Sequence, residues 1–122
     1  MTVAERTRGA FDGAVGTNGR IDVKVLAREL DLPMATIAPA LGLSVRALNA
    51  NPTSFKAQAK AAKLLAAMNE LAVNLLAKRY AILWLKTPQT AFGNRTAADW
   101  LHEGDLDTVC AEIRSFIMNE PD

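Results

Sequence analysis

The longest stretch without a helix breaker most constrains this fold. Residues 56–86 contain neither glycine nor proline, and their apolar residues recur at helical spacing. This pattern predicts one long helix, or two helices with a bend near residues 74–78. A helix of this length, with a broad apolar face, is the natural spine of a small domain. The apolar face is formed by Ala61, Leu64, Leu65, Met68, Leu71, Ala72, Leu75 and Leu76, and is roughly continued by Tyr80, Leu83 and Trp84.

Residues 21–54 contain the start and stop signals of three shorter helices. Asp22 is a suitable N-cap, and Ser44 can cap another helix that ends at Asn51. Between them, Pro33 and Gly42 bracket a short helix, because proline favours helix starts and glycine favours the position after the last turn. The face of the first helix is given by the spacing of Val23, Leu26, Ala27 and Leu30.

The helix–glycine–helix unit at residues 33–50 has the apolar skeleton of a helix-turn-helix. In such a unit the second helix enters the major groove of DNA, where base reading needs hydrogen-bonding side chains. The second helix offers Arg46, Asn49 and Asn51. Two interpretations stay open: a DNA-binding element, or a helix-turn-helix retained as a scaffold or dimer contact.

The C-terminal third predicts a loop followed by two helices. Thr87-Pro88 ends the spine, and residues 88–95 form a tight loop. Thr96 and Asp99 have the spacing of a capping box, and Gly104 and Asp105 separate the short helix from the last one. The last helix has an apolar face made of Leu106, Val109, Cys110, Ile113, Phe116 and Ile117.

The sequence therefore predicts an all-α fold, because no alternating strand pattern of useful length is found. Residues 1–20 contain four glycines and are expected to be flexible or weakly helical. Residues 21–54 form the helix-turn-helix-like region. Residues 55–122 contain the long helix and a small helical domain.

The residue inventory argues against an enzyme. One histidine and one cysteine cannot form a zinc site alone, and no glycine-rich phosphate loop follows a strand. His102 has no well-placed serine nucleophile nearby in the sequence, so a solvated or capping role is expected for it. We predict no catalytic residues, no metal and no cofactor. Without a signal peptide or a membrane-spanning stretch, a cytoplasmic protein is expected.

Charge is divided unevenly along the chain. Residues 1–86 carry twelve Lys or Arg and six Asp or Glu, a formal charge of +6, whereas residues 87–122 carry two and seven, or −5. Such an asymmetry indicates two faces for two partners, with nucleic acid on the basic part and protein on the acidic part. The alternative is two halves that neutralise each other.

Residues 84–109 resemble the toxin-binding domain of the Xre/MbcA/ParS antitoxins. That family has a Trp-Leu, a proline soon after, an aliphatic-Gly-Gly-Arg-x-Pro turn, a Leu-Leu, a glycine and a final helix. This chain departs from the pattern at Asn94, which replaces the second glycine, and at Ala97, which replaces the proline. With the helix-turn-helix-like region, the resemblance covers roughly residues 21–120. The matching positions are Trp84, Leu85, Pro88, Phe92, Gly93, Arg95, Leu101, Gly104 and Val109.

The resemblance implies an antitoxin that binds a RES-type toxin, whose activity consumes NAD, and sits over its NAD cleft. It also implies a homodimer that forms hetero-oligomers with the toxin. The acidic C-terminal third suits a cleft that is cationic for the pyrophosphate of NAD. Phe116 and Ile117 are partner anchors or ordinary core, and Arg95 contacts the partner or holds the turn. The predicted toxin-binding residues are Phe92, Arg95, Glu112, Phe116, Ile117, Met118, Asn119 and Glu120, with the last two entering the cleft.

Two other functions stay open. A transcription regulator would bind operator DNA through residues 33–51, which is compatible with an antitoxin that represses its own operon. A purely structural helical adaptor would bind an unrelated partner.

Overall fold

The predicted spine is two helices, not one. In the computed structural model, which describes residues 9–118, α5 (Phe55–Asn74) ends at a sharp break and α6 (Lys78–Leu85) follows it. Leu76 lies between them with a φ of 65°, in the left-handed region that L-residues rarely adopt. Of the two alternatives, the bent pair is confirmed.

Capping side chains define the helices of the N-terminal half, α2 (Val23–Glu29), α3 (Met34–Leu41) and α4 (Val45–Ala50). The Asp22 carboxylate accepts hydrogen bonds from the backbone N–H groups of Lys24 and Val25, and the Ser44 hydroxyl accepts one from Ala47. Gly42 ends α3 in a left-handed conformation at a φ of 75°. The three predicted helices and their caps are confirmed.

Residues 9–21 pack on the domain as an ordered segment with one short 3-10 helix, η1 (Asp12–Ala14). The Phe11 side chain has no exposed surface. Asn69 of α5 holds the segment: its Oδ1 accepts from the Phe11 N–H at 2.8 Å, and its Nδ2 donates to Asp12 Oδ1 at 2.8 Å. The glycines of residues 1–20 predict a flexible or weakly helical segment, of which residues 1–8 lie outside the described part.

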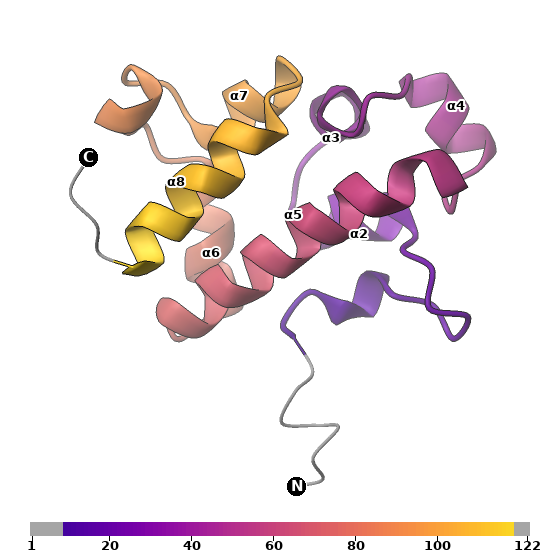
Figure 1. The fold of residues 1–122 in the computed structure, drawn as a ribbon, viewed down its shortest axis with the longest axis horizontal. Helices are drawn as coiled ribbons and strands as arrows, with labels where there is room; N and C mark the ends of the chain where they lie inside the picture. The colour runs from indigo at the N-terminus through magenta and orange to yellow at the C-terminus, as the bar shows by residue number, and fades with distance from the viewer. Residues whose placement is uncertain (1–8, 119–122) are drawn as a thin grey trace, which may run out of the picture.

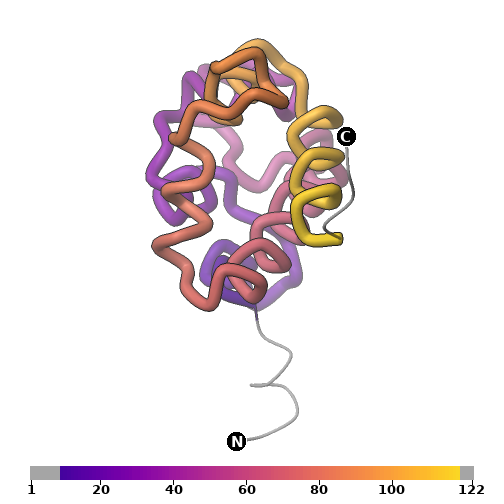
Figure 2. Tube along the Cα trace, turned by 90° about the vertical axis from the view of Figure 1, so that its left-hand side faces the viewer, coloured from indigo at the N-terminus to yellow at the C-terminus, as the bar shows by residue number. Residues whose placement is uncertain are grey.

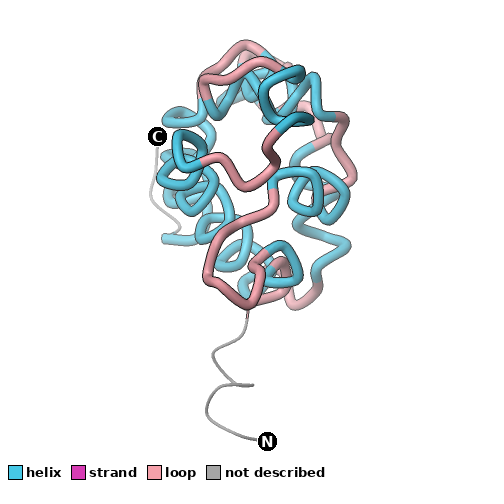
Figure 3. Tube along the Cα trace, turned by 90° about the vertical axis from the view of Figure 1, so that its right-hand side faces the viewer, coloured by secondary structure: helices cyan, strands magenta, loops and turns pink. Residues whose placement is uncertain are grey.

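Three elements complete the fold: η2 (Thr90–Phe92), α7 (Ala97–His102) and α8 (Leu106–Met118). No strand forms within residues 9–118, so the predicted all-α class is confirmed (Figure 3). α5 runs through the middle, with α7 and α8 towards one end of the long axis and α3 and α4 towards the other (Figure 1). The loop after α6 lies beside α7 and α8.

One hydrophobic core joins the two halves, because α7 packs on α3 and α5 packs on both α2 and α3. Within the C-terminal half, α8 packs along α5. Two ion pairs cross between the halves, Lys78 with Glu29 and Lys86 with Asp31, both at 2.5 Å. A third, Lys63 with Asp107 at 2.6 Å, joins α5 to α8 within the C-terminal half. Gly104 turns the chain from α7 into α8 directly over α3, where a Cβ atom would lie 3.4 Å from the Pro39 carbonyl oxygen. Within residues 9–118, no helix combines the length and the apolar character that crossing a membrane requires.

Candidate functional site

The loop between α6 and α7 is closed by its own backbone. The Gln89 N–H donates to the Arg95 carbonyl at 3.0 Å, and the Asn94 N–H donates to the Gln89 carbonyl at 2.9 Å. Gly93 and Asn94 both lie in the left-handed region, at φ values of 67° and 64°. The paired glycines of the family pattern therefore coincide with two left-handed residues. Asn94 fits because asparagine tolerates this conformation better than other side chains.

We expect Asn94→Gly to change the free energy of unfolding by only a few tenths of a kcal/mol, whereas Asn94→Ala lowers it by about 1–2 kcal/mol. The side chain at position 94 is exposed, so the difference between the variants reports the backbone conformation. Urea unfolding of both proteins measures it. Equal stabilities for the two variants would show that position 94 does not need a left-handed residue.

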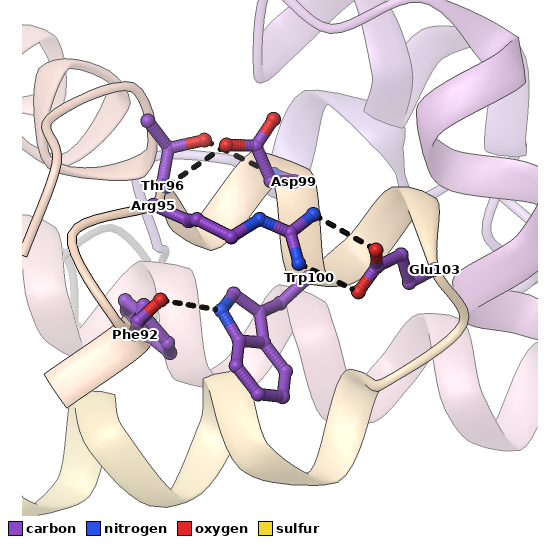
Figure 4. Close-up of polar contacts among 6 residues, drawn as sticks. All are labelled: Phe92, Arg95, Thr96, Asp99, Trp100 and Glu103. Carbon is purple, nitrogen blue, oxygen red and sulfur yellow. Dashed lines mark hydrogen bonds and ion pairs between the residues drawn. The ribbon is translucent and has the colours of Figure 1, made fainter.

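The buried side chain of Phe92 anchors the loop to the core. Its side chain has no exposed surface, and its ring lies 5.9 Å from Trp84 in an edge-on arrangement and 6.0 Å from Trp100. The Trp100 indole N–H donates to the Phe92 carbonyl at 3.1 Å (Figure 4). Phe92 was predicted as a toxin contact. In this structure it supports the loop instead, because a fully buried ring offers no surface to a partner.

Arg95 clamps the loop onto α7. Its guanidinium donates two parallel hydrogen bonds to the Glu103 carboxylate, at 3.0 and 2.9 Å, and lies 6.0 Å from the Trp100 ring centroid (Figure 4). These bonds hold the pKa of Glu103 below its usual value. Of the two roles predicted for Arg95, holding the turn is the one this geometry provides. Both partners are about half exposed, so contact with a toxin stays a prediction.

A capping box fixes the start of α7, as predicted. The Thr96 hydroxyl accepts from the Asp99 N–H and the Asp99 carboxylate accepts from the Thr96 N–H, both at 3.0 Å (Figure 4). The backbone hydrogen bond from Thr96 holds the pKa of Asp99 below its ordinary value of 3.8. The resulting stabilisation is present above that ordinary value and is lost as pH falls through the lowered pKa of the folded state. Ala97 follows at the first helical position, where proline is favoured.

Helix α8 presents its C-terminal turn to solvent. Its face towards the core is formed by Leu106, Val109 and Ile113. Phe116 is 48% exposed and Met118 is 61% exposed, whereas Ile117 is partly buried against the core. Glu112 is also partly buried on this helix. Asn119 and Glu120, the predicted cleft-entering residues, lie outside the described residues.

Cys110 lies on the same helix as a half-buried thiol. Burial raises its pKa, so at neutral pH it packs as a small uncharged hydrophobe.

The predicted DNA-reading side chains are all accessible. Arg46, Asn49 and Asn51 are exposed on or just after α4, which follows α3 and the left-handed Gly42. Helix α4 lies towards the opposite end of the long axis from the C-terminal end of α8 (Figure 1). The chain thus presents two separate surfaces.

Two apolar residues of α6 are exposed although the sequence pattern predicts them to be buried. The helical spacing places Tyr80 and Leu83 on the continued apolar face, but they are 46% and 59% exposed. The break at residues 75–77 turns α6 relative to α5, so the two helices bury faces that do not continue one another. A single helical period drawn through the break could not reveal this. Leu76, also placed on that face, is 90% exposed.

These features define a helical domain with a loop held by its own hydrogen bonds and a last helix whose end exposes apolar side chains. Within residues 9–118, no group of three or more His, Cys, Asp or Glu side chains could hold a metal ion.

Comparison with known families assigns the C-terminal region. Residues 77–115 match the family model of the antitoxin Xre/MbcA/ParS C-terminal toxin-binding domain. The resemblance found in the sequence is confirmed, and the matched residues run from α6 to most of α8. The match supports an antitoxin role and suggests a non-catalytic regulator with a toxin as its partner. No curated protein and no solved structure matches the chain.

Proposed function

We propose that this chain is the antitoxin of a type II toxin–antitoxin system, that its partner is a RES-type toxin, and that it blocks the NAD cleft of that toxin. The observation that carries the proposal is the match of residues 77–115 to a toxin-binding domain. The rigid loop and the end of α8 lie in or beside the matched residues, so they form the contact surface.

Charge supports the choice of an NAD cleft. Residues 87–122 carry a formal charge of −5, and a cleft that receives the pyrophosphate of NAD is cationic. Complementary charge mainly speeds association and orients the partners, whereas affinity comes from a few buried anchors. In this proposal the antitoxin acts in the cytoplasm, as a homodimer that assembles into a hetero-oligomer with the toxin.

Removal of residues 119–122 tests the blockade. We expect the shortened chain to keep its fold and still bind the toxin, while the complex regains NAD turnover, because Asn119 and Glu120 no longer fill the cleft. Co-purification measures binding, and an NAD-consumption assay on the purified complex measures blockade.

A second truncation, of residues 116–122, also removes Phe116, whose ring lies 6.3 Å from Trp84. We expect this longer truncation to weaken toxin binding itself, whereas removal of residues 119–122 alone leaves binding intact. If the chain lacking residues 119–122 inhibits the toxin as fully as the intact protein, these residues do not block the NAD cleft.

Autorepression of an operon is the second candidate function. The observation that favours it is the exposure of Arg46, Asn49 and Asn51 on a capped helix that follows a left-handed glycine. Binding to DNA from upstream of the gene should weaken steeply with salt, because phosphate contacts release counterions. Unmeasurable binding at low salt would remove this candidate.

A further inference from the structure

The elements α6, the loop that follows it and α8 lie on the side turned towards the viewer in Figure 2. A continuous hollow is lined by residues of these three elements and the end of α5. It consists of two adjoining parts of about 480 and 870 Å³. Leu75, Gln89 and Phe116 line both parts, so they form one groove. We call it the α6–α8 groove.

The smaller part of the groove is lined mainly by apolar side chains. Tyr80, Leu83 and Phe116 stand around it, each 46–59% exposed, and the largely buried Trp84 contributes to its lining. Clustered exposed hydrophobes of this kind mark interaction sites, whereas scattered single ones need no explanation. Aromatic side chains such as Tyr80 and Phe116 are also typical of anchor positions in interfaces.

The lining of the groove is held in place by contacts within the chain. Trp84 is held by its ring contacts with Phe92 and Phe116, at 5.9 and 6.3 Å. The end of α6 is held by two further hydrogen bonds: the Thr87 hydroxyl donates to the Leu83 carbonyl at 2.8 Å, and the Gln89 amide donates to the Trp84 carbonyl at 3.3 Å. A preformed surface costs less ordering on association than a flexible one.

We propose that the α6–α8 groove is the main anchor site for the toxin, and that it receives apolar side chains of the toxin. The inference rests on the proposed antitoxin function and adds Leu75, Tyr80 and Leu83 to the contact residues. The groove is continuous with the matched toxin-binding domain: Tyr80, Leu83, Trp84, Thr87 and Gln89 all fall within residues 77–115.

Charge and size changes in the groove test the proposal, with the protein encoded by the adjacent reading frame as the probe. We expect Leu83→Asp to weaken the Kd of the complex by about 30-fold or more, the range of an interface hot spot. Val73→Asp is the matched control, because Val73 is a 71% exposed helical aliphatic that does not line the groove. We expect its Kd to stay within about threefold of the intact protein, because it lies outside the contact.

A second pair of variants keeps the test independent of the introduced charge. Phe116→Ala should weaken binding at least tenfold, the effect of truncating an anchor, whereas Phe55→Ala, at an 81% exposed phenylalanine of α5, should not. Circular dichroism confirms that each variant is folded. Unchanged toxin affinity for folded Leu83→Asp and Phe116→Ala would overturn the groove assignment. So would a Leu83→Asp variant that loses only self-association. Failure of the intact protein to bind the probe would instead overturn the antitoxin function on which the assignment rests.

Discussion

Phe92→Ala is expected to lower the free energy of unfolding by about 3–5 kcal/mol, the range for truncating a buried phenylalanine. The ring has no exposed surface and lies between Trp84 and Trp100, so its loss leaves a cavity lined by two indoles. Urea unfolding followed by tryptophan fluorescence measures the change, because both tryptophans of the chain contact this ring.

Phe55→Ala is the matched control for this measurement. Phe55 is 81% exposed, so its truncation should change stability by no more than about 0.5 kcal/mol. A loss below about 1 kcal/mol for Phe92→Ala, against the 3–5 expected, would show that the loop does not depend on this ring.

Leu48→Ala is expected to lower the free energy of unfolding by about 2–5 kcal/mol, as measured by the fluorescence of the distant tryptophans. Leu48 has no exposed surface and lies on α4, which packs on α2 and α3. Trp84 and Trp100 lie in the other half of the chain. A shift in their unfolding transition therefore reports whether the halves unfold together, as one shared core requires.

Far-UV circular dichroism of the same variant should give the same midpoint as the fluorescence. Val73→Ala, at a 71% exposed position, is the control for an aliphatic truncation without burial. If Leu48→Ala leaves the tryptophan transition unchanged while circular dichroism shows an earlier loss of helix, the halves are separate folding units.

Local chemistry explains why most helix boundaries could be predicted from the sequence. Asp22, Ser44 and Thr96 each satisfy backbone N–H groups of the turn that follows them, which requires only neighbouring residues. Gly42 similarly ends α3 through its own left-handed conformation. These signals do not depend on tertiary contacts.

The break between α5 and α6 could be placed only approximately, because no glycine or proline marks it. Leu76 adopts the left-handed conformation at a cost that surrounding packing must offset. The exposure of Tyr80 and Leu83 depends on that break and was therefore not predicted. The burial of Phe11 depends on Asn69, fifty-eight residues away, which no local pattern reveals.

The candidate site was predicted in outline and not in the role of each side chain. The family pattern located the loop, but Phe92 is a buried support and Arg95 is paired with Glu103, eight residues away. Sequence reasoning had left both roles open for Arg95. The sequence could not decide whether Phe116 is a partner anchor or a core residue. Its side chain is about half exposed because it packs against Trp84 on one side only, a tertiary contact.

The most direct test is expression of the adjacent reading frame with and without this protein, followed by co-purification and an NAD-consumption assay. We predict that the neighbouring product is toxic alone, co-purifies with this chain, and loses NAD turnover in the complex. A neighbouring product that neither binds this chain nor loses NAD turnover in its presence would contradict the antitoxin function.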